Sequence, residues 1–461
     1  MAPDDRTYLL FAGAALAVAL LAGFVLAVLL PLAMALDWGW GARWPALAQA
    51  HGHAQVMGWA GLFILGMGYR LVPRFTGVPL RGRALVVPSG VLLAAGVGLR
   101  VVLQPLADHA AAGALLPLSA LLELAGAAIF AGLTLPALLR ATRARAGFAP
   151  YLVAVDIWLV TQAALAVPWL WDAGRSGVPY LPWDQNRVLL AIQFYGVLLP
   201  AIFGVSLRTV PVFFGRPLPG ARAAWPGCAL LQAGLLAYTA AALWRNYHPE
   251  ASGLRAGETA ALLLVAAGLV APLLLTGAWR RPSRLRPGAR PAARFVQVAY
   301  AWTALAGLLL AYAAATALAA GRDVLPNQTD AVRHLLAVGT VTTMIVGMAR
   351  LITPAFAVPR QYGAPRFWEV QGILLGLSAA TFLRFLGAWP RDPDFFALQQ
   401  WMLAAAGLLA LVAVALFAAS LVRSARRRPL PGPAGGTDQG SPLPTRAAPG
   451  HPERGEEDMD G

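Results

Sequence analysis

The sequence has little charge and almost no cysteine. Only 12% of the 461 residues are charged, lysine is absent so that the basic residues are all arginine, and the one cysteine is Cys228. A single cysteine excludes an internal disulfide and any site built from several thiolates. We therefore expect Cys228 to be a small packing residue.

Apolar residues dominate what remains, since 58% of the chain is hydrophobic. A helix of about 20 residues crosses a hydrocarbon core of roughly 30 Å, and about twelve apolar runs of this length follow one another. Their expected cores begin near Tyr8, His51, Ala84, Ala111, Ala149, Val188, Trp225, Thr259, Phe295, Ala331, Phe367 and Phe396. This pattern predicts an all-α, polytopic membrane bundle of about 12 transmembrane helices.

The arginines gather in every second loop between these runs. The basic loops contain Arg81 and Arg83, Arg143 and Arg145, Arg216 and Arg222, Arg280 and Arg281, Arg360 and Arg366, and Arg427 and Arg428. By the positive-inside bias, both termini are expected in the cytoplasm. The net charge of +15 then reflects topology, so the expected partner is membrane lipid and no nucleic acid.

The chain divides into a membrane domain and a tail. Residues 1–428 hold the twelve expected spans, and the first run lacks a basic start, so we expect it to be a retained span rather than a signal peptide. Residues 429–461 are rich in proline and glycine and then acidic. This composition predicts a disordered cytoplasmic tail.

Five of the six histidines fall on the expected outer side. His109 and His248 lie in short polar loops, where we expect solvated side chains. His51 and His53 open the second span, and His334 opens the tenth. A histidine inside an apolar span needs a partner and is a functional candidate, although a cap or interface role is the alternative.

The stretch around His51 recurs twice along the chain. With shifts of 138 and 281 residues, Gly58, Gly66 and Pro73 align with Gly196, Gly204 and Pro211, and with Gly339, Gly347 and Pro354. The same shift of 281 aligns His53 with His334. The chain therefore reads as a pseudo-threefold repeat of four-helix units, at roughly residues 8–145, 149–281 and 294–428.

These motifs carry a resemblance to known families. A pseudo-threefold bundle with histidines on spans two and ten resembles subunit I of the haem-copper oxidases. The His-x-His run in "HGHAQVMGW" and the later span "RHLLAVGTVTTMIVGMAR" are more closely similar to the NnrS family. That resemblance implies haem, copper as a second cofactor, a role in nitric oxide metabolism or the nitrosative stress response, and the bacterial inner (cytoplasmic) membrane.

The resemblance assigns one histidine on span two and one on span ten to a haem near the outer face. The repeat favours His53 and His334, because it puts them at equivalent depth. Residues two apart on a helix point about 200° away from each other, so His51 would face a different group, such as copper or a haem propionate. The sequence leaves open which of His51 and His53 ligates haem. Haem b is expected, because no C-x-x-C-H motif can attach it covalently.

Other polar residues near these spans are secondary candidates. Arg384, Arg333 and Arg100 are expected on the outer side, and Arg384 is the first choice for binding a propionate, with snorkelling to the interface as the alternative. For Glu123, Asp156 and Gln162, inside spans four and five, we favour interhelical hydrogen bonds over a proton relay.

Three functions are consistent with the sequence. The leading hypothesis is an NnrS-like haem protein that binds or senses nitric oxide. A divergent haem-copper oxidase or nitric oxide reductase subunit is the alternative, but a copper site needs three imidazoles besides those of the haems. A transporter is the third reading. The sequence does not decide whether the chain is an enzyme; an enzyme of this type would be a haem-dependent oxidoreductase.

Overall fold

The computed structural model describes residues 7–41, 43–248, 253–285, 290–356, 367–389 and 393–426. Twelve helices in these ranges are long and apolar enough to cross a membrane. No strand occurs in the same ranges, where Ala146 and Gly220 form only an isolated bridge. The predicted all-α bundle of about twelve spans is confirmed, whereas the resemblance to haem-copper oxidases remains a prediction.

We number the spans 1 to 12 in chain order. Spans 1 to 4 are α1 (Thr7–Val18) with η1 (Ala19–Gly23) and α2 (Phe24–Ala35), α3 (Arg43–His53) with η2 (Ala54–Gly61) and α4 (Leu62–Thr76), η3 (Arg83–Leu85) with α5 (Val86–Leu103) and η4 (Gln104–Leu106), and α6 (Ala110–Arg143).

The remaining eight spans continue the same up-and-down path. Spans 5 to 8 are α7 (Ala149–Ser176), α8 (Trp183–Ala191) with η5 (Ile192–Leu198) and α9 (Leu199–Phe213), α10 (Ala221–Tyr247), and α11 (Leu254–Leu275). Spans 9 to 12 are α12 (Arg290–Ala319), α13 (Pro326–His334) with η7 (Leu335–Thr342) and α14 (Thr343–Phe356), α15 (Phe367–Ala388), and η8 (Pro393–Phe395) with α16 (Phe396–Arg426).

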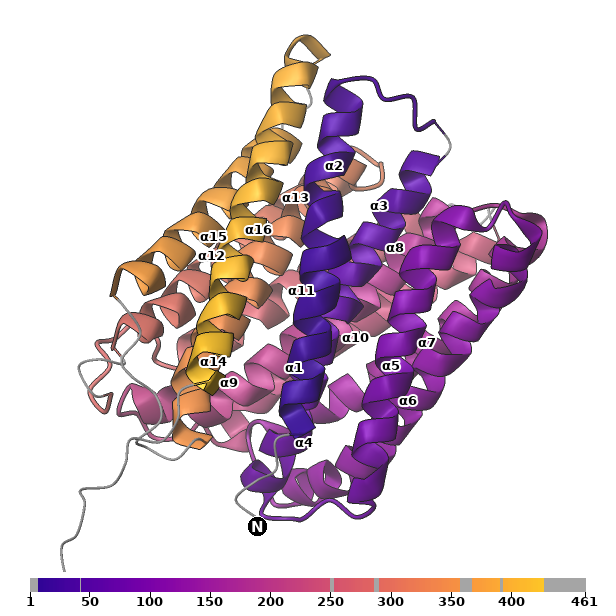
Figure 1. The fold of residues 1–461 in the computed structure, drawn as a ribbon. Coiled ribbons are helices and arrows are strands. Elements are labelled where there is room, and N and C mark those ends of the chain that lie inside the picture. Colours follow the sequence, from indigo (N-terminus) through magenta and orange to yellow (C-terminus); the bar gives the residue numbers. More distant parts are fainter. Residues whose placement is uncertain are drawn as a thin grey trace, which may run out of the picture.

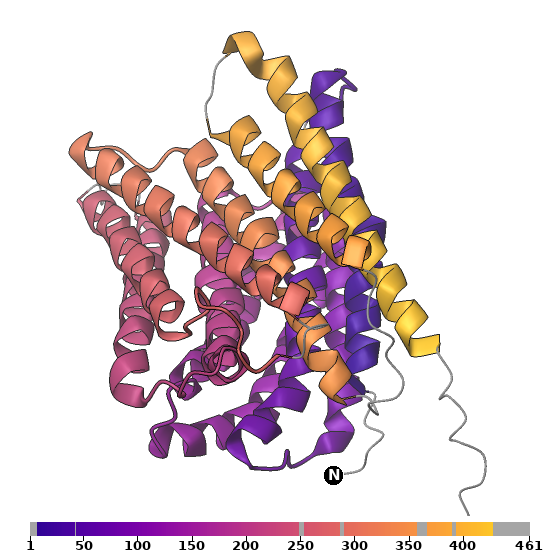
Figure 2. The same ribbon diagram turned by 90° about the vertical axis from the view of Figure 1, so that its left-hand side faces the viewer.

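Spans 2, 6 and 10 form the centre of the bundle. In their most apolar 18-residue windows, 67, 89 and 78% of residues are buried, compared with 28 to 56% in the other spans. The ring of outer spans closes where α16 packs beside α2, as Figure 1 and the turned view in Figure 2 both show. The second span of each predicted repeat unit is therefore the inner one.

Glycines that the predicted repeat aligns lie where the first and second spans of each unit approach closely. A Cβ atom at Gly66 would lie 2.3 Å from Cβ of Phe11, and one at Gly347 would lie 2.4 Å from Cβ of Phe295. At Gly204 it would lie 2.8 Å from Cδ2 of Leu152. These distances are too short for two carbon atoms, so at these positions only glycine lets the first span of a unit approach the second span this closely.

The three inner spans share a second feature, a π-helical segment. A shift of 281 residues aligns both the first and the last residue of η2 with those of η7. A shift of 138 residues aligns the first residue of η2, Ala54, with the first residue of η5, Ile192. Segments of π-helix are rare in proteins, and those that do occur are often found at functional sites. In span 2 this segment directly follows the two histidines.

Span 2 begins earlier than expected. The helix starts at Arg43, eight residues before His51. Hydropathy did not predict this start because the turns that precede His51 are too polar. His334 likewise lies eight residues after the start of α13 at Pro326. Eight residues correspond to about 12 Å of helix, so both histidines lie well inside their helices.

Some sequence predictions concern residues that the structure does not describe. The tail at residues 429–461 and the loop arginines Arg360, Arg366, Arg427 and Arg428 lie outside the described residues. The orientation of the termini and the identity of the membrane remain predictions.

Candidate functional site: a cavity with two histidines

A large cavity lies between the first and the last repeat units. Its volume is about 1000 Å³, and residues of spans 1, 2, 6, 10, 11 and 12 line it. Two histidines, His51 and His334, contribute to the lining, and most of the remaining wall is apolar, including Phe24, Trp59 and Phe194. We call this space the histidine cavity.

The ring of His51 is fixed by a backbone carbonyl of span 1. Its Nδ1 lies 2.9 Å from the carbonyl oxygen of Gly23, which is the last residue of the π-segment η1. A carbonyl oxygen only accepts hydrogen bonds, so Nδ1 carries the hydrogen and donates it. This arrangement leaves Nε2 of His51 as the unprotonated nitrogen of the neutral ring.

His334 is fixed in the same way on the other side of the cavity. Its Nδ1 lies 2.9 Å from the carbonyl oxygen of Asp330 and 3.3 Å from Oδ1 of the same residue. In the part of the chain that the structure describes, no hydrogen bond engages Nε2 of His51 or of His334. A histidine that binds a metal through one nitrogen usually donates its other N–H to a carbonyl or carboxylate, and both rings meet this condition.

Two arginines and one carboxylate belong to the same cavity lining. Nη2 of Arg384 lies 2.8 Å from Oδ2 of Asp330, and Arg333 donates to the carbonyl oxygen of Thr329 at 3.1 Å and lies over the ring of Trp183. His334, Arg384 and Asp330 are close enough to His51 to interact with it electrostatically. Two guanidinium groups against one carboxylate leave excess positive charge at this end of the cavity, which suits an anionic substituent.

His53 is outside the histidine cavity. Its Nε2 lies 2.8 Å from Oε1 of Glu123 in span 4, and both side chains are buried, at 3 and 4% exposure. Arg100, also buried, donates to Gln104 at 3.1 Å. The structure therefore places His334 and His51 on one cavity, whereas His53 does not line that cavity and its Nε2 is engaged by a carboxylate. The predicted haem ligation by His53 is untested.

Arg100 is also away from the cavity, unlike the other two predicted propionate partners. A chain of polar contacts connects its cluster to the cavity wall: Gln104 donates to Oε1 of Gln49 at 2.6 Å, and Gln49 lines the cavity. Gln49 in turn donates to the carbonyl oxygen of Leu181 at 2.7 Å. The His53–Glu123 contact thus connects spans 2 and 4, and the Gln104–Gln49 contact connects spans 3 and 2.

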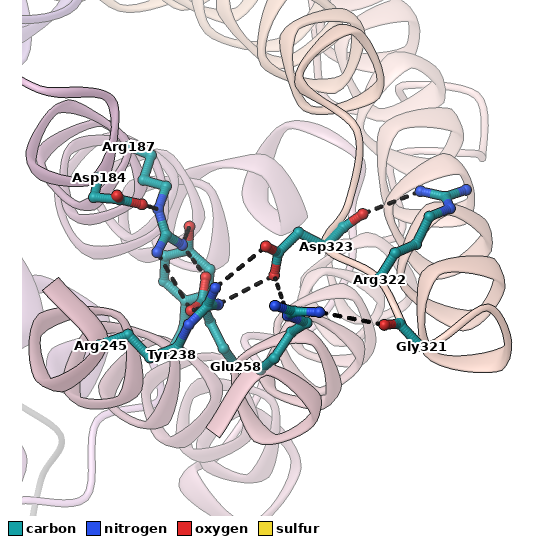
Figure 3. A network of polar contacts seen from close by, with 9 residues as sticks. Asp184, Arg187, Tyr238, Arg245, Glu258, Gly321, Arg322 and Asp323 are labelled. Atoms are coloured by element: carbon teal, nitrogen blue, oxygen red, sulfur yellow. Dashed lines mark hydrogen bonds and ion pairs between the residues drawn. The ribbon is translucent and has the colours of Figure 1, made fainter. Parts of the chain in front are cut away.

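A third polar group connects spans 6, 7 and 8 (Figure 3). Arg187 forms an ion pair with Glu258, which also accepts from Arg245 at 2.6 Å. Arg245 reaches Asp323 at 3.1 Å, and Arg187 binds the exposed Asp184 at 2.8 Å. We call this group the arginine–glutamate network; its side chains bind one another and contain no histidine.

The remaining polar candidates form interhelical contacts. Thr134 donates to Oδ2 of Asp156 at 2.9 Å, and Gln193 donates to Oε1 of Gln162 at 3.1 Å. These contacts and the His53–Glu123 pair confirm the predicted interhelical hydrogen bonds, while a proton relay is untested. Of the loop histidines, His248 stacks on Trp244 with ring centroids 4.5 Å apart.

Sequence reasoning missed two residues that fix the candidate ligands. Asp330 precedes His334 by four residues, a spacing that places two side chains on one face of a helix, so this contact could have been found. The carbonyl of Gly23 leaves no signal in the sequence, because any residue supplies a backbone carbonyl.

The residues of the histidine cavity suit haem. The donor set has two imidazoles with an available Nε2, apolar walls and arginines near the histidines, which matches a flat apolar ring with carboxylates. For copper the fit is weaker, because among the residues that the structure describes no three His, Cys, Asp or Glu side chains are grouped closely enough to hold a metal ion.

Comparison with known proteins agrees with this architecture. No curated protein matches the chain. The sequence profile of the family described as "NnrS protein" matches residues 9–428, which include all twelve spans apart from the first two residues of span 1, and the chain therefore belongs to the NnrS family.

Proposed function

We propose that the chain binds a b-type haem in the histidine cavity, between spans 2 and 10, where Nε2 of His51 and of His334 would hold the iron. One observation carries this proposal. The two histidines come from facing spans, line one cavity, and each hold Nδ1 in a hydrogen bond to a carbonyl while Nε2 is available. His53 is assigned a positioning role instead, because it does not line the histidine cavity and its Nε2 contacts Glu123.

The other residues of the cavity would support the cofactor with apolar contacts, positive charge and hydrogen bonds to the ligands. Phe24, Trp59 and Phe194 supply apolar walls that would exclude water from the ring. Arg384 and Arg333 supply positive charge for the propionates, and Asp330 positions both Arg384 and His334. Such carbonyl and carboxylate contacts fix the tautomer and orientation of a ligating imidazole.

We further propose that the bound haem binds nitric oxide as part of a nitric oxide response. Haem iron coordinates small diatomic gases when a coordination position is open, so one of the two histidines would have to leave the iron before nitric oxide binds. The polarity and access of the surrounding pocket then decide the outcome. Membership of the NnrS family is consistent with this role. With His51 and His334 assigned to haem and His53 bound to Glu123, copper is not included in the proposal.

The test is the visible spectrum of the full chain purified from membranes. We expect a Soret band, extraction of the pigment by acid acetone because no covalent attachment exists, and a shift of the band when nitric oxide is added anaerobically to the reduced protein. A protein without a Soret band contradicts haem binding. Sustained consumption of nitric oxide with an electron donor would instead favour a reductase.

A further inference from the structure

A second, smaller cavity lies deeper in the bundle. Its volume is about 90 Å³, and it is lined mainly by apolar side chains of the inner spans 2, 6 and 10 together with spans 4 and 5. Phe63, Met67, Phe130, Ile202, Val205 and Ile345 are among the lining residues. Only Asp156 and Ser206 bring polar side-chain atoms, and the hydroxyl of Thr134 already donates to Asp156. We call this space the inner cavity.

One aromatic pair separates the inner cavity from the histidine cavity. Trp59 lines the histidine cavity, Phe63 lines the inner cavity, and their ring centroids are 5.6 Å apart. The indole of Trp59 donates to Oγ1 of Thr342 at 3.1 Å, so this side chain is held between spans 2 and 10. A similar division is found on span 6, where Leu198 lines the histidine cavity and Ala201 lines the inner cavity.

The size and chemistry of the inner cavity restrict what can occupy it. A buried water molecule needs two to four polar partners, and an apolar cavity of about 150 Å³ in another protein stays dry and binds xenon. The inner cavity is smaller than that and has an apolar wall, so it suits a molecule with few atoms and no hydrogen-bonding requirement. Small neutral diatomic gases meet these conditions.

We infer that the inner cavity is a binding site for one small neutral gas molecule, separated from the histidine cavity by Trp59 and Phe63. Occupancy of this site does not depend on haem. Its use as a store that supplies gas to the histidine cavity rests on the proposed function.

Xenon is the probe for occupancy. The full chain in detergent is exposed to xenon under pressure, and binding is measured by ¹²⁹Xe NMR exchange or by crystallography. The variant Val205→Phe fills the inner cavity from span 6. Val212→Phe is the matched control, because Val212 is on the same helix but is exposed and does not line the cavity.

We expect wild type and Val212→Phe to bind xenon, and Val205→Phe to lose the bound signal. Absence of bound xenon in the wild type, or equal binding in Val205→Phe and Val212→Phe, overturns the inference. The signal counted is xenon located in the inner cavity, which the proposed haem does not enter, so failure of the proposed function would leave these outcomes unchanged.

A kinetic measurement tests the supply role. After photolysis of carbon monoxide from the reduced haem protein, a gas held in the inner cavity should return in a fast, concentration-independent phase. We expect Val205→Phe to lose that phase while Val212→Phe keeps it. A fast phase of the same amplitude in both variants overturns the supply role.

Discussion

Three polar groups occupy corresponding places in the three repeat units, and only one of them leaves space for a ligand. Each group combines the second, third and fourth spans of a unit, and each has an arginine on the third span: Arg100, Arg245 and Arg384. In the first two units a carboxylate from the fourth span, Glu123 or Glu258, engages a basic side chain of the second span. In the third unit the fourth span instead places Gln399 and Gln400 in the wall of the histidine cavity.

The difference shows how a repeated fold can build one site. A buried charge is tolerated where it is paired, and in two units the charged side chains pair with one another. In the third unit, His334 keeps a nitrogen without a hydrogen-bond partner in the described residues and faces a space of about 1000 Å³. The cavity is therefore specific to this interface and does not follow from the fold alone.

Threefold arrangement also explains why equivalent histidines face different places. In a ring of rotationally related units, each interface joins two different faces, so a residue on one unit meets a non-equivalent residue on the next. His53 corresponds to His334 in the predicted repeat, and its Nε2 contacts Glu123 in the fourth span of its own unit. His334 instead lines the histidine cavity together with His51 of span 2.

Removing a proposed ligand should have the largest effect. His334→Gly is expected to lose haem almost completely, since even outer partners of a metal site change affinity by about 10- to 100-fold. Haem per protein is measured after purification with haem added. Added imidazole should restore part of it by occupying the vacated space, and His109→Ala should bind normally. Full haem content in His334→Gly would remove this residue from the site.

Opening the arginine–glutamate network should instead reduce stability. Glu258→Ala leaves Arg187 and Arg245 without their buried partner, and breaking a buried pair costs about 3 to 5 kcal/mol. The thermal unfolding midpoint in detergent should fall, while haem per folded protein stays constant. Asp184→Ala removes an exposed partner of the same Arg187, which is worth under about 1 kcal/mol. Equal shifts in the two variants would contradict the assignment of Glu258 as the centre of the network.

A smaller effect is expected from the arginine of the histidine cavity. Arg384→Gln removes one positive charge near the propionates and releases Asp330, so haem affinity should fall by about tenfold. Arg322→Gln is the control, because its side chain binds only the backbone of Asp323 in the described region. Haem titration of the apoprotein measures both. If the two variants have the same affinity, Arg384 has no role in holding the cofactor.

The sequence predicted the twelve spans well, because hydrophobic runs and arginine-rich loops are averages over many residues. The repeat that it predicted aligns Gly66, Gly204 and Gly347, and all three prove to be close-packed positions. It did not decide which face of span 2 meets span 10. That depends on how whole helices are rotated against each other, and the decisive contact of His51, the carbonyl of Gly23, belongs to the backbone of another span.

The most direct test of the account compares the two histidines of span 2. His51→Ala removes a proposed ligand, whereas His53→Gln keeps a hydrogen-bond donor for Glu123. Both variants are purified as monodisperse protein, and haem per protein is measured by the pyridine haemochrome spectrum. The account predicts that His51→Ala loses haem and that His53→Gln retains it. Loss of haem in His53→Gln with full retention in His51→Ala would contradict the assignment.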